Sequence, residues 1–459
     1  MSFEKSFSDN KRYVRGYEFQ WTKNHLTAEQ LMPLRKQADE LGLAVVERLL
    51  AIVAAQKQEK GGVNRPDLYT LLKENYAKDS ILRQFWEETH SVPDWVDWEE
   101  IEKGQVFLYR YLAPNITGIV LQGCLGENAT TAGTAEVFIR TGGFNVRVLP
   151  KRFLETFQWQ IQATQSLKSV QPGGDGHIST IRVRLLHAMV RHRILKIAEQ
   201  NPEYYDFERD GTPINLLDCM HAICVFACNT PFVQLPKLGI KPDPQLVKGY
   251  LAVNRYIAYL LGTPAEYFAT VEQAKATMES IMLSEPGPTP ASKVLTMNFI
   301  EMIRDFPGIN ISKSLIETGV RKMNDDEMAD EIGLSKPGYF FQALFRGYCG
   351  ILIVICRLQH WIPFFDRFLT NLSKQFLIDT VLGSSMLKGG SKYEFKHVPS
   401  LKKRTNLQYR ETGGAGMFRP VETLSCISFL IQVLFYLVPL FVVVKVLSGT
   451  IQTVYTMTD

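Results

Sequence analysis

The sequence has no strong excess of either charge. Its 459 residues include 51 Lys and Arg and 47 Asp and Glu, which leaves a net charge of +4. Nucleic-acid-binding domains usually concentrate basic residues on one face, so this balance argues against a nucleic acid as partner. Cysteine is also scarce: the seven residues follow no disulfide spacing, and we interpret them as reduced thiols of a cytosolic protein.

Several catalytic motifs are missing too. No Gly-rich phosphate loop follows a strand, and no Gly-x-Ser-x-Gly elbow occurs. Nucleotide-cofactor enzymes and α/β serine hydrolases depend on these motifs for phosphate binding and for exposure of the nucleophile. The sequence therefore supports neither class.

Strand-like segments are rare, and Arg182-Val183 and residues 144–148 are the only brief candidates. Apolar residues recur instead at helical spacing, as in the stretch that Thr27 opens, with Gln30 completing a capping box, and that continues to about Ala55. We predict an all-α protein with a single large helical domain. Further helices are predicted at residues 99–112, 132–140, 151–165, 179–200, 215–228, 244–261, 265–282, 289–304, 325–332 and 337–357.

One long hydrophobic run stands near the end of the chain. Residues 424–444 (LSCISFLIQVLFYLVPLFVVV) contain no charged residue over 21 positions, and about 20 apolar residues suffice to cross a bilayer. We predict a transmembrane helix at residues 424–447, followed by a short tail at residues 448–459; a buried core helix is the competing interpretation. Because residues 1–24 do not form a signal peptide, the protein is expected to be tail-anchored.

The segment before that helix is basic. Residues 386–423 combine clustered Lys and Arg with several glycines, which predicts a flexible linker able to rest on an anionic membrane surface. By the positive-inside rule this linker places the catalytic bulk in the cytosol, and the endoplasmic reticulum membrane is the expected location. We assign residues 91–385 to a helical catalytic domain and residues 1–90 to an N-terminal helical extension.

A second apolar run covers residues 338–361. Arg346 and Arg357 interrupt it and leave only ten residues between them, which is too short a stretch to cross a bilayer. We interpret the run as a core or interfacial helix, with Trp361 and Phe364 at the membrane interface.

A histidine flanked by two arginines is the most informative motif. Arg184, His187 and Arg191 follow helical spacing, so they share one face of a helix. A neutral imidazole is the usual protein ligand for haem iron, and two guanidinium groups beside it would suit the anionic propionates. The alternative is an amphipathic helix whose histidine and arginines pair with carboxylates in the core.

Other residues could bind metal, with weaker patterns. His221, Cys224 and Cys228 share a helix face but lack the second ligand pair that a zinc site needs, so we interpret them as core packing. Two Glu-x-x-His pairs, Glu87–His90 and Glu394–His397, match the motif of di-iron carboxylate bundles. The second pair lies in the basic linker, and we expect both to be solvated surface.

A further polar cluster precedes the histidine helix. Glu136 lies in a short helix before a Thr-Gly-Gly break, and Arg152 and Thr156 stand one turn apart on the next helix. A carboxylate could take a proton from substrate, while a guanidinium and a hydroxyl could orient substrate or a bound oxygen species. Taken alone, Glu136 would be a surface or salt-bridged residue.

The order of these elements resembles a known family. Glu136, Thr141-Gly142-Gly143, Lys151-Arg152-x-x-x-Thr156 and Arg184-x-x-His187-x-x-x-Arg191 follow one another as in the catalytic domain shared by bacterial rubber oxygenases (latex clearing proteins) and fungal ER-bound mpaB-type oxygenases. The resemblance covers about residues 90–270.

The resemblance implies an all-helical protein with haem b that cleaves carbon–carbon double bonds of isoprenoid chains with dioxygen. It makes His187 the proximal iron ligand, Glu136 the base that removes an allylic proton, and Arg152 and Thr156 the distal residues near bound oxygen. Arg184 and Arg191 would hold the cofactor or brace the helix. The sequence departs from the family at Glu155, where rubber oxygenases carry a lysine, which puts the distal chemistry in doubt.

The main hypothesis is therefore a membrane-anchored, haem-dependent oxygenase acting on a lipophilic isoprenoid or terpenoid substrate. One alternative is a non-catalytic, tail-anchored helical protein that binds lipid or a protein partner. Another is a non-haem iron oxygenase that depends on Glu87 and His90.

Overall fold

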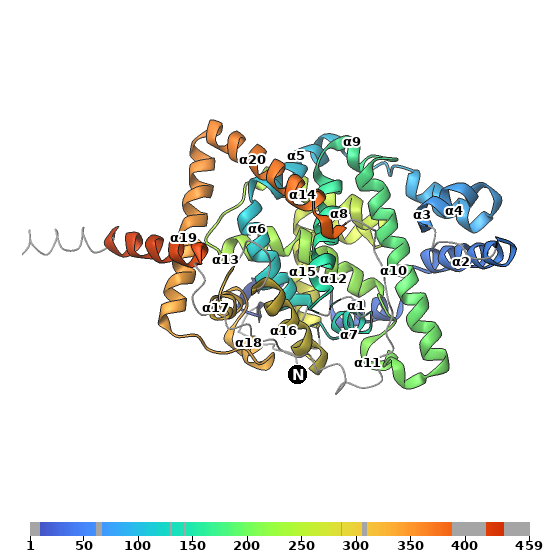
Figure 1. The fold of residues 1–459 in the computed structure, drawn as a ribbon, viewed down its shortest axis with the longest axis horizontal. Coiled ribbons are helices and arrows are strands. Elements are labelled where there is room, and N and C mark those ends of the chain that lie inside the picture. The colour runs from blue at the N-terminus through green and yellow to red at the C-terminus, as the bar shows by residue number, and fades with distance from the viewer. Residues whose placement is uncertain are drawn as a thin grey trace, which may run out of the picture.

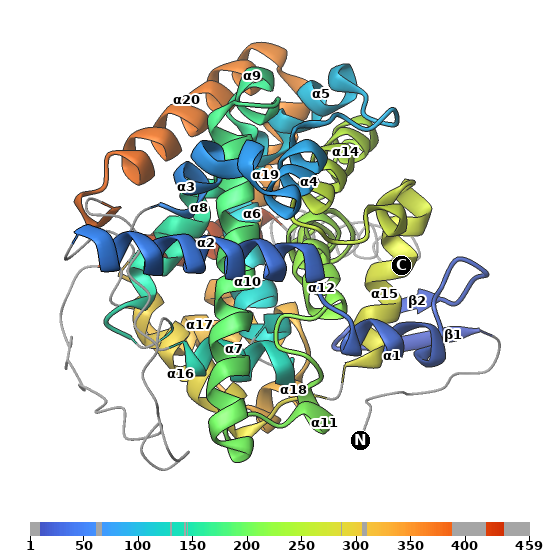
Figure 2. The ribbon, with the colours of Figure 1, turned by 90° about the vertical axis from the view of Figure 1, so that its right-hand side faces the viewer.

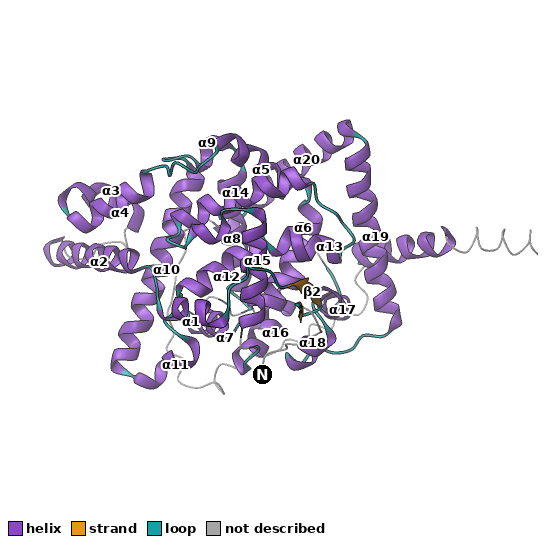
Figure 3. Ribbon diagram, turned by 180° about the vertical axis from the view of Figure 1, so that it is seen from behind, coloured by secondary structure: helices purple, strands orange, loops and turns teal. Residues whose placement is uncertain are grey.

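The computed structural model describes residues 10–60, 67–128, 131–141, 144, 146–285, 287–304, 310–387 and 419–435. Helices make up nearly all of the regular structure, as Figure 3 shows by colour, so the all-α prediction is confirmed. The exception is one antiparallel hairpin of β1 (Lys11–Val14) and β2 (Tyr17–Gln20), in which Lys11 pairs with Gln20 and Val14 with Tyr17.

The described helices fall into three successive stretches of the chain. The first holds α1 (Ala28–Lys36), α2 (Glu40–Lys60), α3 (Leu68–Asn75), η1 (Tyr76–Lys78), α4 (Ser80–His90), α5 (Trp98–Arg110), α6 (Leu112–Gly118) and the π-helix η2 (Ile119–Asn128). The second holds α7 (Ala132–Arg140), α8 (Leu149–Thr164), α9 (Leu167–Val170), α10 (Asp175–Gln200), η3 (Pro202–Tyr204), α11 (Phe207–Asp210), α12 (Leu216–Ala227), the π-helix η4 (Thr230–Gln234), α13 (Leu235–Lys237) and α14 (Pro244–Leu260). The third holds η5 (Ala265–Phe268), α15 (Val271–Ser284), α16 (Pro290–Arg304), α17 (Lys313–Met323), α18 (Asp326–Glu331), α19 (Tyr339–Trp361), α20 (Pro363–Leu382), η6 (Ser385–Leu387) and a helix at Pro420–Phe435.

Local capping explains why the predicted helix boundaries near the site hold. The Asn215 side chain accepts a hydrogen bond from the Asp218 amide and starts α12, as an N-cap residue does. Pro244 occupies the first turn of α14, where its missing N–H costs nothing, and the Asp243 carboxylate caps that end.

One predicted helix and both brief strand candidates differ from the structure, whereas the helix predicted at residues 179–200 is present as α10. The helix expected from Thr27 to Ala55 is broken at residues 37–39 into α1 and α2, because tertiary hydrogen bonds to that segment replace helical ones. Arg182-Val183 lies inside α10 rather than in a strand. The segment at residues 144–148 is a turn wherever the structure describes it, and the β1–β2 hairpin was not anticipated.

The long helix α10 organises the half of the molecule that faces the viewer in Figure 2. There, α2 crosses α10, and α3 and α4 lie beside it. Apolar residues of α2, α3, α4 and α10 form one core cluster, and the largest cluster is centred on α12, α14, α15, α16 and α17. The N-terminal helices thus pack on the main body, while the domain boundaries at residues 90 and 385 stay predictions.

The opposite side of the molecule carries α19, α20 and the helix Pro420–Phe435, which projects from the body in Figure 1. Among the described residues, α19 is the one helix long and apolar enough to cross a membrane, and the bent pair of α12 with residues 230–237 passes the same test together. Only 22% of the apolar window of α19 is buried, so it is not a core helix. The predicted membrane helix at residues 424–447 is described as helix to Phe435, and its remainder, most of the linker and the tail lie outside the described residues.

Candidate functional site

His187 sits in the middle of α10, a helix held firmly at its start. Gly174 provides the extended N-cap residue, and Gly176 lies so close to α8 that an added Cβ would stand 2.3 Å from the Gln162 carbonyl oxygen. Only glycine permits that approach. The side chain of His187 therefore projects from a long helix seated directly on the end of α8.

The imidazole of His187 has no hydrogen-bonding or ionic partner among the described residues. Burial, helped by the charge of Arg191, lowers its pKa to about 4, so the ring is neutral at physiological pH and keeps a free lone pair. Nevertheless the side chain is only half-buried. A densely surrounded histidine with an uncovered, unused nitrogen has the properties that a metal ligand requires.

Helix faces are also incompletely covered where α8 and α12 meet the first half of α10. Ala222 is exposed although it lies in the middle of α12, between buried neighbours, and Phe226 one turn later is half-buried. Trp159 of α8 donates a hydrogen bond from Nε1 to Oγ1 of Thr180 in α10 at 3.0 Å. The same indole meets the ring of Phe226 edge-on at 6.3 Å. Thus α8, α10 and α12 meet around Trp159 with partly open apolar and polar side chains.

Arg184 is committed to carboxylates. Its Nε and Nη2 donate to the two oxygens of Asp39 at 2.8 and 2.9 Å, and Nη1 donates to Glu88 at 2.7 Å. Although burial alone would raise it, these bonds hold the pKa of Asp39 below its ordinary value. Asp39 lies in the break between α1 and α2, so Arg184 fastens that junction to α10.

Arg191 is bound by backbone carbonyls instead. Its guanidinium donates to the carbonyl oxygens of Asp39, Pro213 and Ile214 at 3.1, 3.1 and 2.6 Å. Ile214 has a φ of 54°, a left-handed conformation that a β-branched residue adopts only when its surroundings impose it. Arg191 thus stabilises a strained turn just before α12. The contacts of both arginines join α10 to neighbouring segments, as expected of residues that brace the helix. A role in holding a cofactor stays a prediction.

Glu136 is buried on α7 and faces basic residues. Its carboxylate accepts a hydrogen bond from Nε of Arg140 at 3.1 Å and forms a longer ion pair with Arg209 of α11 at 3.5 Å. Arg140 also donates to the carbonyl of Tyr204. Next to Glu136, Val137 packs in one apolar cluster with Val190 of α10. Two arginines therefore hold the Glu136 carboxylate on a helix that shares an apolar cluster with the histidine helix.

On α8, Arg152 and Thr156 lie one turn apart, as predicted. Nη1 of Arg152 donates to the Glu155 carboxylate at 2.6 Å, and Lys151 stands 3.9 Å from the other Glu155 oxygen. The Thr156 hydroxyl donates to the carbonyl of Arg152 at 3.1 Å. Glu155 thus serves as the anionic partner of Arg152.

The alternative metal sites find no support. Among the described residues no group of three His, Cys, Asp or Glu side chains could hold a metal ion. Cys224 and Cys228 are buried packing residues, as predicted. Glu87 is exposed, whereas Nδ1 of His90 donates to the Trp86 carbonyl at 2.9 Å and the ring stacks on that indole. Glu394 and His397 lie outside the described residues.

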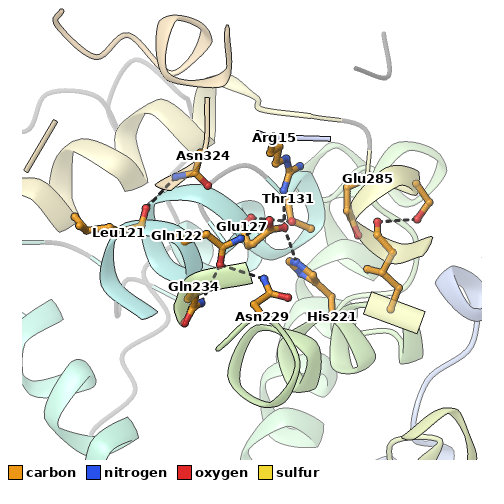
Figure 4. Close-up of polar contacts among 12 residues, drawn as sticks. Arg15, Leu121, Gln122, Glu127, Thr131, His221, Asn229, Gln234, Glu285 and Asn324 are labelled. Atoms are coloured by element: carbon orange, nitrogen blue, oxygen red, sulfur yellow. Dashed lines mark hydrogen bonds and ion pairs between the residues drawn. The ribbon is translucent and has the colours of Figure 1, made fainter. Parts of the chain in front are cut away.

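His221 belongs to a buried polar network that sequence reasoning missed. Figure 4 shows its Nε2 at 3.3 Å from the Glu127 carboxylate, which Arg15 binds at 2.6 Å. Gln122 links the two π-helices, because its side-chain oxygen accepts from Gln234 at 2.8 Å. Similarly, no sequence signal pointed to Asp39 and Glu88 as the partners of Arg184, since their pairing joins distant segments.

Three comparisons with known proteins bear on this site. A family model described as "ER-bound oxygenase mpaB/B'/Rubber oxygenase, catalytic domain" matches residues 112–353, which include every candidate residue from Glu136 to Arg191. The rubber oxygenase of Streptomyces sp. (strain K30) is 23% identical over 266 residues, which make up 56% of this chain and 61% of that protein. A solved structure of latex clearing protein in the closed state has a TM-score of 0.52 at 18% identity and covers 83% of this chain and 96% of its own. The last similarity shows a common fold, and together they confirm the predicted family.

Proposed function

This chain belongs to the family of ER-bound mpaB-type and rubber oxygenase catalytic domains, and from that premise we propose that it is a haem-dependent oxygenase. Its substrate in this proposal is a lipophilic isoprenoid or terpenoid, since the name of the Streptomyces relative points to polyisoprene. The predicted membrane helix would keep the protein where such a substrate accumulates, at the endoplasmic reticulum membrane with the catalytic domain in the cytosol.

His187 is the single observation that carries the proposal. Its ring is neutral, lies within the helical body and has no partner among the described residues. Bound through this imidazole, haem b would supply the iron centre that binds and activates dioxygen. On α12, which meets α10 through Trp159, the exposed Ala222 and the half-buried Phe226 would offer apolar surface to a macrocycle. These features fit the cofactor that the family resemblance implies.

The other site residues would act on substrate and oxygen. Glu136 would take the allylic proton and later return it to product, and Arg140 and Arg209 would hold this carboxylate in place. Arg152 and Thr156, which lie one turn apart on α8, would orient the reacting groups by hydrogen bonds. In double-bond cleavage each alkene carbon receives one oxygen atom of O2, so two carbonyl groups form and no external reductant is consumed.

The alternatives fare less well on particular observations. A non-haem iron enzyme would need a ligand set such as Glu87 with His90, and their side chains are, respectively, exposed and stacked on Trp86. A non-catalytic lipid- or protein-binding protein would give no reason for an unpartnered neutral histidine between two buried, well-bonded arginines.

The proposal predicts a separation between cofactor binding and turnover. The Glu136→Gln variant of the full chain should retain haem absorption, while its O2-dependent conversion of a short polyisoprene oligomer falls by about 10²–10⁴-fold, the usual contribution of a general base. Asp210→Asn is the matched control, because it removes a buried carboxylate from the same Arg209 partner and should change turnover only a few-fold. If wild-type protein with bound haem consumes no O2 with any isoprenoid alkene, the oxygenase proposal is wrong.

A further inference from the structure

The outward face of α19 combines aromatic ends with two arginines. Tyr339, Val354 and Trp361 are exposed along this face, with exposures of 90%, 56% and 69%. Arg346 and Arg357 are exposed on the same side, and neither has a hydrogen-bonding or ionic partner among the described residues. The opposite face, with Leu344 and Leu352, is buried against the body. The helix is therefore amphipathic, with a rim of aromatic and basic residues.

The helix Pro420–Phe435 crosses α19 at two glycines. A Cβ added to Gly347 would meet the Ser425 carbonyl oxygen at 1.9 Å, and one added to Gly350 would meet the Gln432 side chain at 1.9 Å. Beyond that crossing the helix points away from the body in Figure 1. It exposes large apolar side chains, and the sequence stays apolar to Val444. These exposed residues are Leu424, Ile427, Leu430, Ile431, Leu434 and Phe435.

A third apolar surface continues from the end of α19 onto α20. Phe364, Phe368, Leu372 and Phe376 are exposed at four-residue intervals along this helix. On its other side Leu377 packs with apolar residues of α8, the helix that carries Arg152 and Thr156. The exposed stripe on α20 is thus one helix thickness, about 10 Å, from the predicted distal helix.

A membrane-spanning α19 conflicts with these positions. Arg346 and Arg357 stand eleven residues apart, about 16 Å along the helix, and a spanning helix would hold at least one of them in hydrocarbon without a partner. A charged side chain without a partner is strongly disfavoured there. A helix lying in the interface instead places arginines among lipid phosphates and aromatic rings at the headgroup boundary.

We propose that α19 lies flat on an anionic lipid bilayer, with the start of α20 beside it, as a second membrane contact next to the projecting C-terminal helix. Lipid is the occupant that the surroundings favour, because the apolar helix at Pro420–Phe435 emerges through the same surface and the adjoining stretch of residues 388–418 is basic. Two unpaired arginines complement anionic headgroups. This orientation goes beyond the proposed function and would deliver a lipophilic substrate next to α8.

Depth measurements on the full chain in vesicles of neutral and anionic phospholipid test the proposal. An environment-sensitive fluorescent amino acid placed at Tyr339, Val354 or Trp361 reports quenching by lipids that carry a spin label near the headgroup or at mid-bilayer. Phe207 of α11, which is exposed on the far side of the molecule, is the control position.

If α19 lies in the interface, the label near the headgroup should quench all three positions more than the mid-bilayer label does, since such helices enter the bilayer by only about 5–10 Å. The extent of quenching at the three positions should agree to within about twofold. Phe207 should not be quenched. Deepest quenching at Val354 would mean that α19 spans the membrane, and no quenching beyond that of Phe207 would mean that it faces water. Either result overturns the proposal.

A charge variant adds a second, independent readout. The Arg346→Gln/Arg357→Gln protein should lose at least about half of the Val354 quenching in anionic vesicles, because basic residues near such a surface are attracted to the anionic headgroups. Arg83→Gln/Arg193→Gln, which removes two exposed arginines from α4 and α10, should change nothing. Equal loss in both variants would contradict the proposal. Neither measurement uses haem or turnover, so its failure would leave the proposed function standing.

Discussion

The His187→Ala protein is expected to lack the haem Soret band that the wild-type protein shows after expression with sufficient iron, whereas His192→Ala should keep it. Both histidines lie on α10, but His192 pairs with Glu47 of α2 at 3.5 Å while His187 has no partner among the described residues. Substitution of a residue that only hydrogen-bonds to a metal ligand typically lowers metal affinity by about 10–100-fold. Loss of the iron ligand itself should lower haem affinity by more than that.

The comparison of the two variants separates ligation from folding. Both substitutions remove a partly buried imidazole from one helix, so a general loss of packing should affect both proteins alike. Far-ultraviolet circular dichroism and gel filtration check that each variant is folded. A Soret band of normal intensity in His187→Ala, or its loss in both variants, would contradict the assignment of His187.

Arg184→Gln is expected to lower the free energy of unfolding of the apoprotein by about 3–5 kcal/mol, the usual cost of breaking a buried ion pair. The substitution leaves the buried Asp39 carboxylate without its bidentate partner. Arg182→Gln is the matched control. Arg182 lies on the same helix as Arg184 and also binds an aspartate, Asp67, through two guanidinium nitrogens. That pair is exposed, so its loss should cost only about 0–1 kcal/mol.

Urea unfolding of the detergent-solubilised apoproteins measures this difference, and it also distinguishes the two predicted roles of Arg184. If Arg184 is a brace, its replacement lowers the free energy of unfolding whether or not haem is present. A residue that holds a propionate would leave the apoprotein as stable as Arg182→Gln and weaken only haem binding. The second pattern would show that the contacts to Asp39 and Glu88 do not determine the role of Arg184.

The helices around the site could be predicted because local chemistry marks their ends. Asn201 and Pro202 stop α10, Asn215 starts α12, and Pro244 starts α14. The ordered motif that contains His187 likewise depends on spacing along single helices, so it could be recognised without knowledge of how the helices pack. The family assignment followed from that order and is confirmed.

What the sequence could not reveal depends on contacts between distant segments. The break at residues 37–39 is stabilised by Arg184 and Arg191, which lie more than a hundred residues away in the sequence. The helical spacing of apolar residues continues across the break, so the sequence pattern does not reveal where α1 ends. The β1–β2 hairpin turns through Arg15 and Gly16 at positive φ rather than through a familiar Asn-Gly pair. Likewise, Glu136 has one partner four residues away on its own helix, Arg140, but the second, Arg209, is brought to it only by folding.

The apolar run at residues 338–361 illustrates a different limit. Its two arginines argue against a membrane span, but its composition fits a core helix and an interfacial helix alike, and only the packing of α19 distinguishes these two. One face is buried, the other presents arginines, and a second apolar helix crosses it. A hydropathy average combines the buried and the outward faces of a helix. The sequence therefore could not distinguish a core helix from an interfacial helix here.

Chemical rescue of the ligand tests the central claim most directly. In a His187→Gly protein, free imidazole can enter the space left by the side chain and bind haem iron in its place, so the Soret band should return as imidazole is added. The account predicts this recovery in His187→Gly and no change on adding imidazole to His192→Gly, which should bind haem from the outset. A His187→Gly protein that is folded and binds haem normally without imidazole would contradict it.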